Sequence, residues 1–238
     1  RDLPVPGREL DGIHFAMEYL PQQNRRVAGE AAAWPSGGWW FTRRQGDIVA
    51  TGRQVVVIGG GDTGSSCLGT ALRLGARRVS QVEILPEPPP SRSPRTPWPD
   101  WPEMRRDSSS HQEGGERRWS VLTESFEGSA GRVEALRCAA VDWVPGPDGP
   151  SVPSKLAGSQ FVLEAELVLL ALGFVGSGQD PLVDQLGIER DARGLPCRDR
   201  EGMTGRPGVF VAGDMAQGAS LVVRAIADGM RVADGVAT

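Results

Sequence analysis

The sequence is poor in cysteine and histidine, which limits the metal and redox chemistry it can support. Its three cysteines, Cys67, Cys138 and Cys197, form no C-x-x-C pair. Because zinc sites and iron–sulfur clusters take their ligands from closely spaced cysteines, no metal centre is predicted. A sparse and odd cysteine count indicates a reducing compartment, and we expect a cytoplasmic protein. His14 and His111 are far apart in the sequence, and neither is predicted to act as an acid or base.

Long hydrophobic runs and excess positive charge are also missing. The longest apolar run, Leu167–Val175, is far shorter than the roughly 20 residues that span a bilayer. Charges and prolines interrupt every apolar stretch near the start, so no secretory signal is predicted. A formal net charge of −4 provides no basic surface for nucleic acid. Neither a membrane nor a nucleic acid is therefore an expected partner.

Glycine, in contrast, is abundant, and one cluster of it directly follows a strand pattern. Val55–Ile58 is a run of β-favouring apolar residues. A glycine-rich segment comes straight after it: Gly59, Gly60, Gly61, Asp62, Thr63 and Gly64. A helix-forming stretch over 65–74 and a second strand pattern over 79–85 complete a βαβ unit. This order of strand, turn and helix predicts a site for the diphosphate of a dinucleotide.

Each key position of this turn has a predicted role. Gly59 permits the tight turn, Gly61 lets the backbone approach the phosphates, and Gly64 lets the helix pack closely against the strand. We expect the anion at the helix N-terminus, where unpaired N–H groups and the helix dipole stabilise it. Glu83, at the end of the second strand, is placed to accept hydrogen bonds from both hydroxyls of the adenosine ribose. The alternative is a glycine-rich turn without a ligand in an α/β domain.

A second pattern of strand, turn and helix lies near the end of the chain. Val209–Ala212 is predicted to be a buried strand, and Gly213 and Asp214 follow it directly. Ser220 is predicted to cap the last helix. Gly213 would let a ligand approach the backbone, and Asp214 would accept a hydrogen bond from a polyol hydroxyl. A plain structural turn explains this pattern equally well, because such helix starts are frequent.

The remaining segments are less regular. Residues 31–44, rich in alanine and then in tryptophan, predict an irregular insertion. The four prolines within 86–90 exclude a helix or a central strand, and the polar residues 105–118 predict a mobile loop. Leu167–Leu172 is continuously apolar, as a parallel strand buried on both faces should be, and it ends in Gly173.

Several motifs, in order along the chain, carry a resemblance to a known family. The N-terminal ones are RDLPVPGRELDG at 1–12, VVVIGGGDTG at 55–64 and TPWPDWP at 96–102. The C-terminal ones are PGVFVAGD at 207–214 and SLVVRAIADG at 220–229. Together they closely resemble the small (beta) subunit of glutamate synthase over nearly the whole chain.

This resemblance implies an α/β fold with two Rossmann-like dinucleotide-binding domains, one for FAD and one for NAD(P)H, the second inserted into the first. Residues 48–173 would form the NAD(P)H-binding domain. Residues 1–47, with the irregular insertion, and residues 174–238 would be parts of an incomplete FAD-binding domain. Gly213 and Asp214 would then meet the ribityl and phosphate region of the flavin.

The resemblance also implies the chemistry. Ser220, Leu221 and Val222 would face the flavin ring, and Gly173 would belong to the cofactor-binding region. The reaction would be hydride transfer from the nicotinamide to the flavin, which demands no catalytic acid or base from the protein. Electrons would pass through iron–sulfur clusters to the glutamate synthase large subunit. That partner would form glutamate from 2-oxoglutarate and glutamine-derived ammonia.

The sequence departs from the family pattern in several places. It lacks the family's N-terminal half, with the iron–sulfur cysteines and the first FAD glycine turn, so we expect that the chain alone does not hold FAD stably. Gln217 and Arg224 stand where the pattern has arginine and tryptophan. Glu83 would repel a 2′-phosphate and favours NADH, although Arg92 and Arg95 follow closely enough to pair with one.

Two other functions stay open at this point. The chain would serve equally well in another two-domain flavin-dependent NAD(P)H oxidoreductase that feeds a different acceptor. It would also serve as a nucleotide-binding fragment without catalysis.

Overall fold

The computed structural model describes residues 1–30, 46–100, 102–146, 149–176 and 181–237. Their contacts divide the chain into two compact units. The larger, which we call the N-terminal unit, is Asp2–Leu172, and the C-terminal unit is Gly173–Thr238 together with Arg1. Each unit is described by itself.

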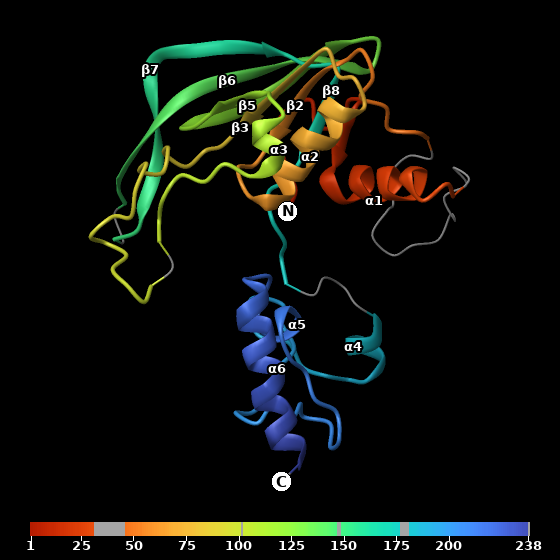
Figure 1. The fold of residues 1–238 in the computed structure, drawn as a ribbon, viewed down its shortest axis with the longest axis vertical. Helices are drawn as coiled ribbons and strands as arrows, with labels where there is room; N and C mark the ends of the chain where they lie inside the picture. Colours follow the sequence, from red (N-terminus) through yellow and green to blue (C-terminus); the bar gives the residue numbers. More distant parts are fainter. Residues whose placement is uncertain (31–45, 101, 147–148, 177–180, 238) are drawn as a thin grey trace. The chain divides into compact units, whose positions relative to one another are not determined.

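The N-terminal unit is built on a five-stranded parallel sheet with the strand order β1-β8-β2-β3-β4 (Figure 1). Its strands are β1 (Ile13–Phe15), β2 (Gln54–Ile58), β3 (Arg78–Val82), β4 (Glu116–Arg118) and β8 (Leu167–Leu170). The helices of this unit are α1 (Ala16–Val27), α2 (Asp62–Arg73) and the short α3 (Ser109–Gln112). The predicted α/β class with a parallel sheet is therefore confirmed.

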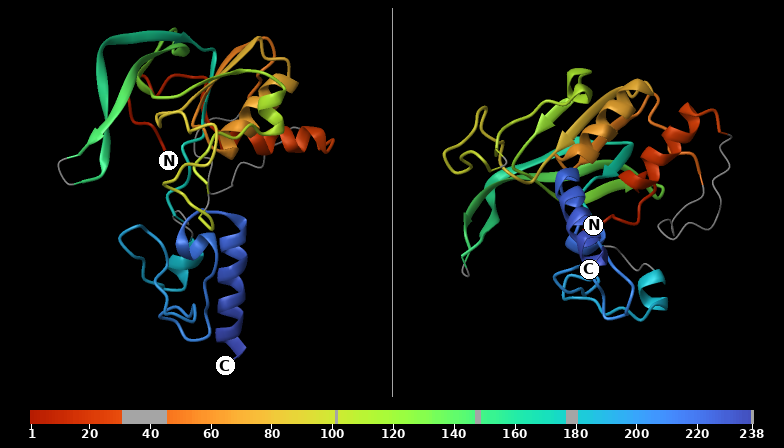
Figure 2. Two further views of the ribbon diagram at one scale, coloured as in Figure 1. Left: turned by 60° about the vertical axis from the view of Figure 1, so that its left-hand side comes forward. Right: turned by 60° about the horizontal axis from the view of Figure 1, so that its bottom comes forward.

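A second, antiparallel sheet of three strands completes this unit. Its order is β5 (Val121–Ser129), β6 (Arg132–Pro145) and β7 (Ser151–Glu164). β6 and β7 form a long hairpin, which the two views of Figure 2 show from different sides. β7 is an edge strand, and most of its residues are exposed.

The alternation of side chains along β2 explains how these layers pack. Val55 and Val57 point to one face of the parallel sheet and join a core with residues of α1 and α2, including Tyr19 and Leu68. Val56 and Ile58 point to the other face and join a core with residues of the antiparallel sheet. Because β2 is buried on both faces, its sequence is continuously apolar. The end of β2, where the glycine turn begins, is thus fixed from both sides.

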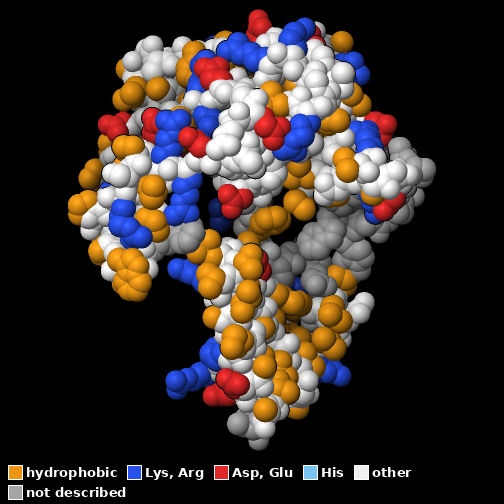
Figure 3. Space-filling view, in the orientation of Figure 1, with side chains coloured by type: hydrophobic (Ala, Val, Ile, Leu, Met, Phe, Trp, Pro, Cys, Tyr) orange, Lys and Arg blue, Asp and Glu red, His pale blue; other side chains and the backbone are white. Residues whose placement is uncertain are grey.

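The C-terminal unit has little core of its own. It contains α4 (Pro181–Gln185), α5 (Asp214–Gln217) and α6 (Val222–Ala237). Its buried apolar residues are Val183, Leu195, Val211, Ala216 and Val232. The apolar side chains of Val222, Ile226 and Met230 on α6 are all more than half exposed, and Figure 3 shows hydrophobic side chains along this helix.

The strand predicted at Val209–Ala212 does not form. Phe210 makes a single bridge to Met203 and otherwise this segment is irregular. A β-strand needs a neighbouring strand to satisfy its backbone groups, and the described part of this unit offers none. The last helix begins at Val222 rather than at Ser220, so Ser220 does not act as its cap.

Three other expectations from the sequence can be compared with the structure. The segment 105–118, predicted as a loop, contains α3 and the edge strand β4. The segment 1–47 was expected to belong to the FAD-binding part, but β1 and α1 pack in the N-terminal unit with the glycine turn. The predicted insertion at 31–44 lies outside the described residues. Among the residues that are described, no helix is long and apolar enough to cross a bilayer.

Candidate functional site

The predicted site residues fall into two groups, one in each unit. The N-terminal group consists of Gly59, Gly60, Gly61, Asp62, Thr63, Gly64 and Glu83. The C-terminal group consists of Gly173, Gly213, Asp214, Ser220, Leu221 and Val222. The structure brings the members of the first group together at the end of β2 and the start of α2.

Gly59 and Gly64 make this turn possible. Gly59 has a φ of +123°, and a Cβ atom there would overlap the carbonyl group of Ala171, which follows β8. A Cβ atom on Gly64 would overlap the carbonyl oxygen of Gly59 and lie 2.6 Å from Nε2 of Gln81. Both positions therefore require glycine, and α2 starts directly against the end of β2.

Gly61 differs from its neighbours because the space beside it is open. It is the N-cap residue of α2, and no side chain caps the helix there. A Cβ atom on Gly61 would meet nothing within 4 Å. The first N–H groups of a helix have no intrahelical partner, so Gly61, Asp62 and Thr63 present donors at an accessible helix start. The negative charge of a phosphate group suits such a position.

Glu83 contacts the turn directly, one residue after the end of β3. Its Oε2 accepts a hydrogen bond from the Gly60 N–H at 2.6 Å, and its Oε1 accepts one from the Leu85 N–H at 3.0 Å. The carboxylate predicted to bind a ribose thus already holds the backbone of the glycine turn. Each oxygen keeps a further lone pair with which it can accept from a ligand hydroxyl.

Sequence reasoning missed Gln81, a buried residue of β3. Its Nε2 donates to the carbonyl oxygen of Gly59 at 2.8 Å, and its Oε1 lies 2.9 Å from Nε2 of His111. The signal was the period of two along a strand, which places Gln81 and Glu83 on the same side. His111, for which no acid–base role is predicted, is thus linked to the glycine turn through Gln81.

The C-terminal group is arranged around Gly213, which has a φ of +64° and precedes α5. The Gly213 N–H donates to Oδ2 of Asp228 at 2.8 Å. Oδ1 of Asp214 accepts from the N–H of Ser220 at 3.3 Å, and this contact closes the loop between α5 and α6. Asp214 and Ser220 are both exposed, as a ligand-facing loop would be.

The buried carboxylate of Asp228 is the centre of an ion-pair cluster that the sequence did not indicate. Arg198 donates to both of its oxygens, at 2.9 Å and 3.0 Å, and Arg231 donates to Oδ1 at 2.6 Å. The hydrogen bonds from Arg198 are the main cause that lowers the pKa of Asp228 well below its ordinary value. Asp228 therefore carries a negative charge that fixes the Gly213 turn to α6.

The other predicted residues of this group are Gly173, Leu221 and Val222, and they differ in exposure. Gly173 has a φ of +79° and open space beside it. Leu221 is half-buried and precedes α6, whereas Val222, the first residue of α6, is 76% exposed. These residues have the accessibility that a ligand site needs.

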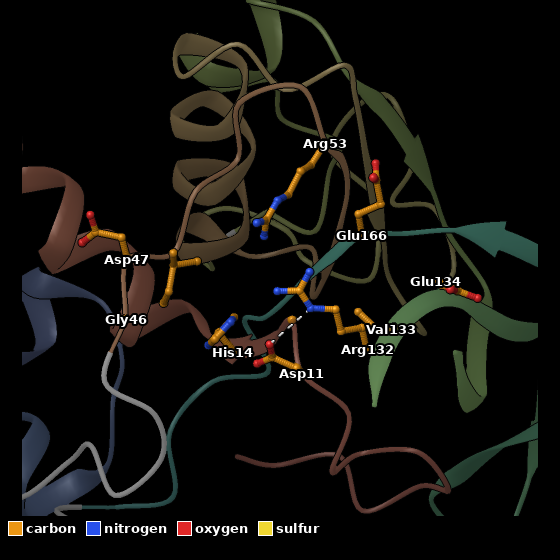
Figure 4. Close-up of a pocket in the computed structure, with 11 residues that line it drawn as sticks. Asp11, His14, Gly46, Asp47, Arg53, Arg132, Val133, Glu134 and Glu166 are labelled. Atoms are coloured by element: carbon orange, nitrogen blue, oxygen red, sulfur yellow. Dashed lines mark ion pairs between the residues drawn. The ribbon is translucent and has the colours of Figure 1, made fainter. Parts of the chain in front are cut away.

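A separate pocket of about 380 Å³ lies at the opposite edge of the parallel sheet, near the amino ends of its strands. It is lined by Asp11, His14, Arg53, Arg132 and Glu166, among others, and Figure 4 shows the ion pair between Arg132 and Asp11. Open α/β sheets bind ligands at the carboxyl ends of their strands. This pocket is therefore not part of the dinucleotide site.

The fold defines a class. The chain has the fold of Mycobacterium tuberculosis FprA, solved in complex with NADPH, with a TM-score of 0.65 and 16% identity. This likeness covers 100% of the present chain and 60% of FprA. A family model described as pyridine nucleotide-disulphide oxidoreductase matches residues 138–229. The fold class is thus that of the FAD- and NAD(P)-binding oxidoreductases.

Sequence comparison is more specific. The chain is 50% identical over 236 residues to the glutamate synthase [NADPH] small chain of Mycobacterium tuberculosis (strain CDC 1551 / Oshkosh), covering 99% of this chain and 46% of that protein. It is 37% identical over 243 residues to the glutamate synthase [NADH] of Schizosaccharomyces pombe, covering 98% of this chain and 11% of that protein. The resemblance to the glutamate synthase small subunit is confirmed. The chain spans about half the length of the first of these relatives.

The contact between Gly64 and Gly59 generates a prediction about stability. Gly64→Ala should lower the free energy of unfolding by about 1–3 kcal/mol, because the added methyl group must displace a carbonyl oxygen. Gly61→Ala is the matched control and should cost less than about 1 kcal/mol, since its methyl group enters open space and only the preference of an N-cap for glycine over alanine is lost. Urea denaturation followed by circular dichroism measures both variants. Equal stability of Gly64→Ala and the unmodified chain would refute the close packing described above.

The Asp228 cluster generates a second prediction. Asp228→Asn should destabilise the C-terminal unit by about 3–5 kcal/mol, because two arginines lose their buried counter-charge. Since the folded pKa is lowered, the contribution of this carboxylate is fully present above the unfolded pKa of about 3.9 and is lost as the pH falls below it. Hydrogen exchange of α6, measured at neutral and acidic pH, should show this difference, and exposed Asp234→Asn is the control. Unchanged protection of α6 in Asp228→Asn at neutral pH contradicts this assignment.

Proposed function

We propose that this chain is the NAD(P)H-binding part, with a portion of the FAD-binding part, of an electron-input module of the glutamate synthase type. The observation that carries the proposal is the open N-terminus of α2 beside Gly61, at the end of a buried parallel strand. The 50% identity to a glutamate synthase small chain supports the same reading. In this function a nicotinamide would transfer hydride to FAD.

A dinucleotide suits the glycine turn on physical grounds. A diphosphate needs several N–H donors, no side chain in its path and a favourable dipole, and the start of α2 offers all three. Asp62 is an unfavourable group, because its charge lies in the first turn of α2, but the residue is exposed and its charge is therefore screened by solvent.

The proposed flavin residues are Gly213, Asp214, Ser220, Leu221 and Val222, with Gly173 at the junction to the N-terminal unit. Gly213 keeps its backbone clear of a side chain, and Asp214 has an exposed carboxylate suited to a polyol hydroxyl. This chain's residues would orient the flavin and exclude water from it, while the two cofactors supply the hydride chemistry when bound. No acid or base of the protein is required.

Electrons would leave the flavin for a large subunit that forms glutamate from glutamine-derived ammonia and 2-oxoglutarate. Iron–sulfur clusters on this route would be held by polypeptide equivalent to the half of the relatives that this chain does not cover. Such a partner and such substrates belong to the glutamate synthases named above. For this chain they follow from similarity over less than half of the relative's length.

Flavin reduction tests the proposal. The chain is mixed anaerobically with FAD, with the half of a glutamate synthase small chain that it does not cover, and with the matching large subunit, and NADH or NADPH is then added. Loss of the visible flavin absorbance, together with glutamate formation, supports a glutamate synthase module. Flavin reduction without glutamate favours another flavin oxidoreductase, and binding of the nucleotide without flavin reduction favours a non-catalytic nucleotide-binding fragment.

The open space at Gly61 generates a prediction about binding. Gly61→Ala should weaken NADH binding at least tenfold, because its methyl group occupies the approach of the diphosphate. The fold should be unaffected, so the loss would be specific to the ligand. Titration of nicotinamide fluorescence gives the dissociation constant. Wild-type affinity in Gly61→Ala would place the diphosphate elsewhere.

Coenzyme choice generates a further prediction. We propose that the negative charge of Glu83 disfavours a 2′-phosphate and thereby favours NADH, although the relatives above are named for either coenzyme. Glu83→Gln removes this charge and keeps an oxygen that can accept from the Gly60 N–H. The ratio of the dissociation constants for NADPH and NADH should therefore fall about fivefold or more, since like-charge repulsion is lost. An unchanged ratio assigns the choice of coenzyme to other residues, such as Arg92 or Arg95.

A further inference from the structure

One peptide group in the glycine turn is held at both ends by side chains of the neighbouring strand. The peptide between Gly59 and Gly60 points its carbonyl oxygen at Nε2 of Gln81, at 2.8 Å, and its N–H at Oε2 of Glu83, at 2.6 Å. Gln81 and Glu83 are two residues apart along β3 and its end. They contact opposite ends of the same peptide plane, since the C=O and N–H of a trans peptide point in opposite directions.

The two residues of this peptide do not themselves restrict its rotation. Both are glycine, and Gly59 already has a φ of +123°. Glycine populates regions of φ and ψ that other residues avoid, so the orientation of the peptide plane is set by contacts with neighbouring residues. The donors proposed to bind the diphosphate, on Gly61 and Asp62, follow it directly along the chain. Any rotation of the Gly59–Gly60 peptide therefore changes the direction of those donors.

The Gln81 side chain is itself held by a neighbouring residue, His111. Nε2 of His111 lies 2.9 Å from Oε1 of Gln81, and Nδ1 of His111 lies 3.2 Å from the backbone nitrogen of Ser108. Because Nδ1 accepts from that N–H, Nε2 carries the proton and donates to Gln81. The amide of Gln81 must then turn its nitrogen toward Gly59. The histidine thus fixes which way the Gln81 amide faces.

We propose that Gln81, oriented by His111, and Glu83 act as positioning residues that lock the Gly59–Gly60 peptide and so preorganise the amides that receive the nucleotide diphosphate. This inference rests on the proposed dinucleotide binding and adds residues that do not themselves contact the phosphates. A preorganised site binds more tightly because the ordering of the turn is not required at the moment of binding. A buried amide that only filled space would have no effect on the ligand.

Two matched substitutions separate positioning from simple stability. Gln81→Met removes the hydrogen bond to Gly59 while keeping the length of the side chain. Gln23→Met is the control. Gln23 lies on α1, is also buried, and donates through its Nε2 to the backbone carbonyl of Ile48 at 3.1 Å. Each full-length variant is characterised by its melting temperature and by its dissociation constant for NADH.

We expect both variants to melt at a lower temperature, and only Gln81→Met to bind NADH about tenfold more weakly, the size of one lost hydrogen bond of this kind. Equal affinity of Gln81→Met and Gln23→Met would overturn the positioning role. If the unmodified chain binds neither NADH nor NADPH, the proposed function itself fails, which is a different result.

His111 provides a milder second test should Gln81→Met not fold. His111→Leu removes the hydrogen bond to Oε1 of Gln81, so that the amide is held only by the Gly59 carbonyl, and the dissociation constant for NADH should rise about threefold. His111→Gln retains an N–H donor at the same reach and should restore the affinity. Rescue by glutamine but not by leucine supports the orientation of Gln81 by His111, whereas equal affinity of the two variants refutes it.

Discussion

The structure depends on a contact too close for any side chain, between Gly64 at the start of α2 and the carbonyl of Gly59 at the end of β2. This contact lets the helix begin directly over the end of a strand that is buried on both faces. The N–H groups of the first helical turn are then delivered to the carboxyl edge of the parallel sheet, with open space beside Gly61. The proposed anion binding at this edge would follow from backbone geometry, before any charged side chain contributes.

The two units use the same device to hold their glycine turns. In the N-terminal unit the Glu83 carboxylate accepts from the Gly60 N–H, and in the C-terminal unit the Asp228 carboxylate accepts from the Gly213 N–H. A carboxylate is suited to this task because a charged acceptor forms stronger hydrogen bonds than a neutral one. Asp228 is also neutralised by two arginines, whereas the charge of Glu83 stays available to influence which coenzyme approaches. The same kind of contact thus serves stability in one unit and proposed specificity in the other.

The sequence predicted those elements whose packing leaves a strong local pattern. The strands β2, β3 and β8 and the helix α2 were found because buried parallel strands are continuously apolar and the glycine turn has a fixed spacing. The edge strand β4 was missed, since Glu116–Arg118 is polar and only its pairing with β3 makes it a strand. At Val209–Ala212 a strand was predicted that does not form, because this apolar run has no partner strand among the described residues. Gln81 and Asp228 were missed because their roles lie in contacts with residues 22 and 15 positions away in the chain.

The small core of the C-terminal unit and its exposed α6 residues contrast with the well-packed N-terminal unit, in which the nucleotide turn lies. Nucleotide binding to this well-packed unit can therefore be measured directly. Isothermal titration calorimetry of the full chain, with folding checked by circular dichroism, should give saturable heats for a reduced pyridine nucleotide at one site per chain. We expect such binding for NADH, and weaker binding for NADPH. If the folded chain releases or absorbs no heat with either nucleotide, the start of α2 is not a dinucleotide site.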